Sequence, residues 1–146
     1  MEVAKPTQAQ LLSEILSKAE SIPLEIRNQV GSFLQKTING DQIETCVIYE
    51  ITQGVLAYIL TTAKLIFLRA DAKGLRSEYG YLSKVVGITR STLSEAKEGL
   101  DTNIQVKFDQ GGFGLNYSTQ KHSDIDRFFE RVDEAILATK RRSSNG

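Results

Sequence analysis

The sequence predicts an α+β fold in which a helical hairpin precedes seven antiparallel strands, arranged as a barrel or sandwich that a C-terminal amphipathic helix closes. Residues 7–39 carry apolar side chains at helical spacing. From residue 45 to residue 117, short runs of β-branched and aromatic residues recur about every ten residues, with turn residues between them. The helical period returns at Ser123 and lasts almost to the end of the chain.

Two helices open the chain. Thr7 and Gln10 have the spacing of a capping box at the start of the first helix. Pro23 fits the first turn of a second helix, which we expect to end at Asn39 and Gly40. The apolar face of the first helix comprises Leu11, Leu12, Ile15, Leu16 and Ala19, and that of the second comprises Ile26, Val30, Phe33, Leu34 and Ile38.

Seven strands follow. They are expected at Cys46–Ile51, Val55–Leu60, Leu65–Leu68, Leu75–Leu82, Val85–Thr92, Ile104–Asp109 and Phe113–Tyr117. Gly80 interrupts the fourth run and favours a β-bulge. The connection between the fifth and sixth runs has room for one helical turn, at Ser94–Leu100.

The last element is a helix with Ser123 at its N-cap. The helix dipole is complemented at both ends. The first turn carries Asp124 and Asp126, and the far end carries the basic run Lys140–Arg142. Its apolar stripe comprises Ile125, Phe128, Phe129, Val132 and Ile136.

The composition is that of a soluble globular chain. The 146 residues include 18 basic and 18 acidic side chains, a balance that argues against a nucleic-acid binder. The single cysteine, Cys46, excludes an intramolecular disulfide. The first residues lack the apolar core of a signal peptide, and no apolar run reaches the ~18 residues of a membrane helix. We therefore expect a cytoplasmic protein.

The stretch Tyr58–Leu68, YILTTAKLIFL, carries a family resemblance. A hydrophobic strand ends in Thr61, a polar turn reaches Lys64, and a Leu-Ile-Phe strand leaves it. In this motif, and in its series of strands with a closing helix, the chain resembles the small bacterial PH-like and GRAM-like domains of the pleckstrin-homology superfold. The resemblance covers roughly residues 45–138 and implies a PH-like domain at 43–142, with the helical hairpin at 1–42 as an extension and 143–146 as a tail.

No set of residues indicates catalysis. His122 is the only histidine and has no second histidine to share a metal, so we expect neither a metal site nor another cofactor. Cys46 lies in an apolar run and is expected to be a buried, inert thiol. The glycines at 111, 112 and 114 precede a strand rather than a helix, which favours a hairpin turn over a phosphate loop. We expect a protein that is not an enzyme, and no small-molecule substrate is indicated.

The resemblance implies one candidate lipid site. Phosphoinositide-binding PH domains usually draw basic residues from the first-to-second and the third-to-fourth strand connections. The second of these regions offers Arg69, Lys73 and Arg76, whereas the first, Thr52–Gly54, has no basic residue. Anionic membrane is therefore the alternative partner, bound through these three cations.

The helical hairpin is not required by a PH-like barrel, so its apolar face has two possible uses. It packs on the outer face of the barrel, or it docks a partner or a second copy through Leu11, Leu12, Ile15 and Leu16. The superfold does not fix function. The leading hypothesis is a non-enzymatic interaction or scaffold module that binds a protein partner or self-associates, at the hairpin or at a groove between a strand edge and the closing helix.

Overall fold

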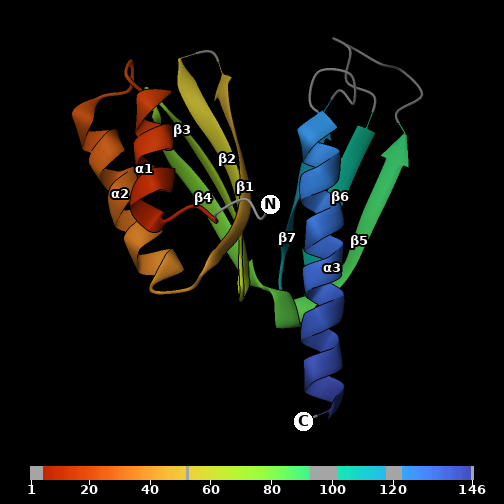
Figure 1. Ribbon diagram of the computed structural model, residues 1–146. Coiled ribbons are helices and arrows are strands. Elements are labelled where there is room, and N and C mark those ends of the chain that lie inside the picture. Colours follow the sequence, from red (N-terminus) through yellow and green to blue (C-terminus); the bar gives the residue numbers. More distant parts are fainter. Residues whose placement is uncertain (1–4, 52, 93–101, 118–122, 146) are drawn as a thin grey trace. The chain divides into compact units, whose positions relative to one another are not determined.

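A computed structural model of the chain describes residues 5–51, 53–92, 102–117 and 123–145 (Figure 1). The chain divides into two compact units, Met1–Tyr79 and Gly80–Gly146. This division groups the helical hairpin with the first strands, and it cuts the domain expected at 43–142 within its fourth strand.

Three α-helices, one 3₁₀ turn and seven strands make up the described chain. The helical elements are α1 (Gln8–Ser17), α2 (Leu24–Ile38), η1 (Leu82–Lys84) and α3 (Ser123–Asn145). The strands are β1 (Ile43–Ile51), β2 (Gly54–Thr61), β3 (Lys64–Asp71), β4 (Gly74–Tyr81), β5 (Val85–Thr92), β6 (Thr102–Phe108) and β7 (Gly112–Tyr117). They form two antiparallel sheets with the orders β1-β2-β3-β4 and β5-β6-β7.

The helix ends follow from local chemistry. The backbone N–H of Gln10 donates to the Thr7 hydroxyl (3.1 Å), and the Thr7 N–H donates to the Gln10 side chain (2.9 Å), which completes the predicted capping box. Pro23 is the N-cap of α2 rather than its first helical residue. Asn39 ends α2 in the left-handed conformation, with φ of 40°.

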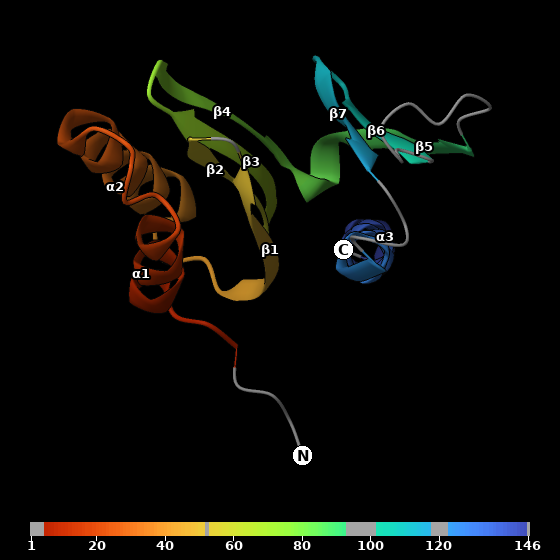
Figure 2. The same ribbon diagram turned by 90° about the horizontal axis from the view of Figure 1, so that it is seen from above.

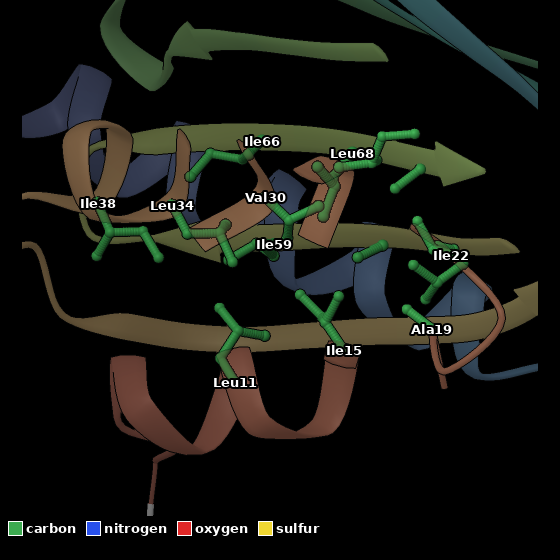
Figure 3. Close-up of a cluster of buried hydrophobic side chains, with 14 of the residues drawn as sticks. Leu11, Ile15, Ala19, Ile22, Val30, Leu34, Ile38, Ile59, Ile66 and Leu68 are labelled. Atoms are coloured by element: carbon green, nitrogen blue, oxygen red, sulfur yellow. The ribbon is translucent and has the colours of Figure 1, made fainter. Parts of the chain in front are cut away.

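The first unit is built as two layers, in which α1 and α2 cover one face of the four-stranded sheet (Figure 2). The register pairs Ile59 of β2 with Ile66 of β3, and Ala57 with Leu68, so these side chains share the face that meets the helices. Figure 3 shows this core. The helical hairpin contributes six residues of α1 and α2 and two of the connection between them, and the sheet contributes seven: Leu11, Ile15, Ile26, Val30, Leu34 and Ile38 of the helices, Ala19 and Ile22 of the connection, and Ile43, Val55, Ala57, Ile59, Ile66, Leu68 and Ala70 of the strands.

Lys64 fastens the β2–β3 turn to the end of α2. Its ammonium group donates to the carbonyl oxygen of Thr37 (2.7 Å) and pairs with the Asp41 carboxylate (3.0 Å), while only 11% of the side chain is exposed. The Thr61 hydroxyl accepts from the backbone N–H groups of Ala63 (3.2 Å) and Lys64 (2.9 Å) and so closes the same turn. A buried cation needs such partners, because an unpaired charge is costly to desolvate. Lys64 therefore has a structural role.

In the second unit, α3 lies along one face of the sheet β5-β6-β7 (Figures 1 and 2). The apolar stripe predicted for the last helix is buried. One carboxylate ties the helix start to two strands, because Asp126 accepts hydrogen bonds from Arg90 of β5 and from the hydroxyl of Tyr117 of β7.

The structure corrects several expectations. The seven strands do not form one closed barrel, because the sheet order separates β1–β4 from β5–β7. The first strand begins at Ile43, three residues before the expected Cys46, and the predicted tail is helical as far as Asn145. Gly80 makes room for the Phe108 ring, which a Cβ at this position would overlap. The helical turn expected at Ser94–Leu100, and His122, lie outside the described residues.

Candidate interaction surfaces

The proposed docking face of α1 is divided between the core and the surface. Leu11 and Ile15 have exposed fractions of 0% and pack inside the first unit. Leu12 is half-buried and packs against that core, where its side chain lies 3.8 Å from the position of a Cβ at Gly31. Leu16 is also half-buried. The chain thus covers the central residues of this face itself, and only Leu12 and Leu16 retain exposed surface.

The three cations of the candidate lipid site lie on the hairpin that β3 and β4 form. Arg69 is 52% exposed and lies 3.8 Å from Asp71, and Arg76 is 73% exposed and lies 3.7 Å from Glu78. The backbone N–H of Lys73 donates to the Asp71 carboxylate (2.9 Å), which shapes the turn. In both ion pairs the N–O distance is long and the arginine is exposed to solvent, so the guanidinium groups remain accessible to an anion. The two carboxylates nevertheless leave the segment from Arg69 to Glu78 with only one net positive charge.

The sequence did not single out β7 as a binding site, although the structure places it at the edge of its sheet. It pairs with β6 in an unbroken register from Tyr117–Thr102 to Gly112–Lys107, and no further strand follows it in the sheet order. Its six residues, GFGLNY, include neither a charge nor a proline. The other strands at a sheet end carry charges: Glu44 and Glu50 in β1, Arg76 and Glu78 in β4, and Arg90 in β5.

Charged side chains, prolines and bulges are the usual means by which proteins prevent pairing at an exposed strand. In β1 and β5 a register shift adds to the charges, between Ile43 and Thr45 and between Val85 and Gly87. Within the described sheets, β7 is the edge strand that shows none of these features. The signal was present in the sequence as a run without charge from Gln110 to Gln120.

An open hollow of about 450 Å³ in the second unit is lined by residues of all three strands, β5, β6 and β7. Its lining includes Val86, Gln105, Lys107 and Gly111–Gly114. The register sets Lys107 between Gly87 and Gly112, so small residues flank the lysine on both neighbouring strands. A Cβ at Gly112 would overlap the backbone of β6, which explains why glycine is needed there. Val86 is 64% exposed beside this hollow and adds an apolar element to it.

Two groups in the first unit have raised pKa values: the hydroxyl of Tyr58, which is buried, and the thiol of Cys46, which is half-buried rather than buried as expected. Burial, with a smaller contribution from the Glu14 carboxylate, raises the pKa of the Cys46 thiol to about 11. Burial also raises the pKa of Tyr58, with Glu78 as the second cause. Both groups are therefore protonated at neutral pH, which makes Cys46 a poor nucleophile.

Comparison with known proteins assigns no family. No protein-family model matches the chain, and no curated protein matches it. Among solved structures, the chain is similar to a DUF1696 family protein with a pleckstrin-homology domain from Shewanella loihica PV-4. The two share 11% sequence identity with a TM-score of 0.48, over 72% of this chain and 92% of that chain. A likeness of this strength fixes neither fold nor function.

The described residues contain no cluster of three or more His, Cys, Asp or Glu side chains that could hold a metal ion. Within the same part of the chain, no helix is long and apolar enough to cross a membrane. The surfaces that stand out are thus the edge of β7 with its hollow, and the basic hairpin of β3 and β4.

Proposed function

We propose that the protein is a non-enzymatic interaction module of PH-like fold, which binds an extended segment of a partner protein by strand addition along β7. The observation that supports this is the edge of β7, which lacks charge, proline and register shift and lies beside an open hollow. The chain order of four strands, three strands and a C-terminal helix is the order on which the PH-like assignment depends.

Strand addition uses two sources of binding free energy. Backbone hydrogen bonds to the edge strand provide affinity, and pockets for alternate side chains provide specificity. On β7, Gly112 and Gly114 are exposed and carry no side chain that would hinder an approaching backbone. The hollow is large enough for one or two side chains of the added segment, and Lys107 at its wall favours an acidic or polar residue there.

The test uses a random peptide library displayed on phage, selected on the immobilised full chain. Selected peptides are titrated into isotope-labelled protein, and the amide shifts are mapped by NMR. We expect the largest shifts, and new protection from hydrogen exchange, at the amides of β7. The proposal fails if no peptide is selected, or if the selected peptides shift amides away from this strand.

Two matched variants sharpen this test. The register places Thr89, Gln105 and Gly114 in one row across the sheet, with Thr89 on β5 and Gly114 on β7. Gly114→Lys puts a charge on the proposed edge and should weaken the selected peptides at least about tenfold, by roughly 1.4 kcal/mol. Thr89→Lys puts the same charge at the other end of the row and should change the affinity less than about twofold. Equal effects of the two variants would contradict binding at β7.

The basic hairpin supports a second candidate function, peripheral binding to anionic membrane through Arg69, Lys73 and Arg76. The exposed guanidinium groups and their long ion pairs favour it. With one net positive charge on the segment from Arg69 to Glu78, and about 1 kcal/mol for each basic residue near an anionic surface, we expect only weak binding. Sedimentation with vesicles rich in phosphatidylserine should show binding at low salt that is lost at physiological salt. Binding that resists salt, or none at low salt, would reject this electrostatic mode.

A further inference from the structure

The exposed side of α3 carries a symmetric pattern of charges around Leu137. Asp133 and Glu134 precede Leu137 by four and three residues, and Lys140 and Arg141 follow it by three and four. Side chains at these spacings share one face of a helix. All five are exposed, including 53% of Leu137. The face therefore consists of an acidic pair, a central leucine and a basic pair.

Neighbouring turns of the same helix cannot pair these charges with one another. The acidic and basic residues are six to eight positions apart, which is about 9–12 Å along the axis. Glu134 has an ion pair with Arg131, at 3.7 Å and with both side chains largely exposed. Such a surface pair is weak and leaves the carboxylate available to a stronger partner.

We propose that α3 pairs with α3 of a second copy of this chain, antiparallel about a twofold axis at Leu137. In this arrangement a residue three positions after Leu137 faces the residue three positions before it in the other copy. Lys140 then meets Glu134, and Arg141 meets Asp133, so that the twofold axis generates four ion pairs around the two leucines. Charge complementarity thus identifies a second copy as the occupant of this face.

The same pattern opposes the parallel arrangement. Parallel helices in register would place Asp133 against Asp133 and Arg141 against Arg141, and like charges in contact are unfavourable. Antiparallel packing also sets the two helix dipoles in the favourable sense. The inference depends on α3 alone and stands without the proposal for β7.

The C-terminal part of α3 extends past the strands of its own unit. Ile136 is the last buried residue of its apolar stripe, and the C-terminal turns continue beyond the ends of the three strands (Figure 1). The proposed contact spans residues 133–141, about two and a half helical turns, and is smaller than a standard protein interface of about 1,600 Å². We therefore expect a weak dimer in a monomer–dimer equilibrium, sensitive to salt because its ion pairs are exposed.

Sedimentation velocity of the full chain from micromolar to millimolar concentration tests this pairing. The wild-type chain should shift toward the dimer with concentration at low salt, and should do so less at about 0.5 M salt, where charges are screened beyond about 4 Å. The double variants Asp133→Lys with Glu134→Lys, and Lys140→Glu with Arg141→Glu, should each lower the association constant at least about tenfold. Circular dichroism should confirm that each variant keeps its helix content.

Mixing the two double variants gives the decisive measurement. One variant then has four basic residues on this face and the other has four acidic ones, so each facing pair is again of opposite charge. Their equimolar mixture should form a heterodimer at least as tight as the wild-type dimer. Arg127→Glu, ten residues before Leu137 on the same helix, is the control and should dimerise as the wild type does. The inference is overturned if the wild type remains monomeric, if either double variant dimerises like the wild type, or if the mixture does not associate.

Discussion

Replacing a single leucine of α1 tests whether the helical hairpin belongs to the fold of the first unit. Leu11 has an exposed fraction of 0% and packs in the core that the two helices share with the sheet. Leu12, its neighbour, is half-buried at the edge of that core. The pair Leu11→Ala and Leu12→Ala therefore applies the same chemical change one position apart, at two depths.

The expected magnitude follows from burial. Leu11→Ala removes a fully buried side chain and leaves a cavity between helix and sheet, which costs about 2–5 kcal/mol in the free energy of unfolding. Leu12→Ala loses only part of that burial, and about 1 kcal/mol is expected. In a chain of this size, 3 kcal/mol corresponds to a fall in Tm of roughly 6–12 °C.

Urea unfolding followed by far-ultraviolet circular dichroism measures both variants against the wild type. The midpoint for Leu11→Ala should fall well below that for Leu12→Ala, and the slope of the transition should be unchanged if the unit unfolds as one. The reasoning is refuted if both variants unfold with the same midpoint. It is also refuted if Leu11→Ala melts the helical signal while the sheet unfolds at its wild-type midpoint.

Two further perturbations examine the buried Lys64 and the half-buried thiol of Cys46 in the same unit. Lys64→Met removes the ammonium group that binds Thr37 and Asp41, and should lower the free energy of unfolding by about 1–3 kcal/mol in urea; an unchanged midpoint would show that these contacts contribute nothing. Because burial raises the pKa of Cys46 from about 9.0 to about 11, its thiolate fraction at pH 8 should be about a hundredfold below that of an ordinary thiol, and Ellman's reagent should react correspondingly slowly. Since the unfolded thiol ionises first as the pH rises, stability should fall between about pH 9 and pH 11, and a flat profile there would contradict the raised pKa of this thiol.

Most elements of the fold could be predicted from the sequence because their signals are local. The capping box at Thr7 and the stop at Asn39 each require only a few neighbouring residues. The ends of the helices and strands were predicted less accurately. The helical tail after Arg142 has no apolar period to reveal it, and β1 begins where Glu44 interrupts the apolar run. Whether strands close into one barrel depends on hydrogen bonds between distant segments, which periodicity does not encode.

The candidate surfaces were harder to predict, for a related reason. An edge strand is defined by the absence of a neighbour, and a sequence does not record which strand lies last in a sheet. The charge pattern around Leu137 was readable, since its spacings are helical, but its exposure was not. The match of the basic run Lys140–Arg142 to the helix dipole accounts for the cations but not for the acidic pair one turn before Leu137.

The packing of the helical hairpin on the sheet could have been predicted from the sequence, although the signal lies in the strands rather than in the helices. A strand with one face in water alternates apolar and polar residues, whereas a strand buried on both faces is a continuous apolar run. Val55–Leu60 is such a run, and Leu65–Leu68 is another. In the structure, Ile59 faces the helices with 0% exposed, and Leu60 points to the opposite face with 1% exposed. Two apolar faces require two covering layers, and α1 and α2 supply the layer on one of them. The central strands therefore already implied that the hairpin would be used inside the chain.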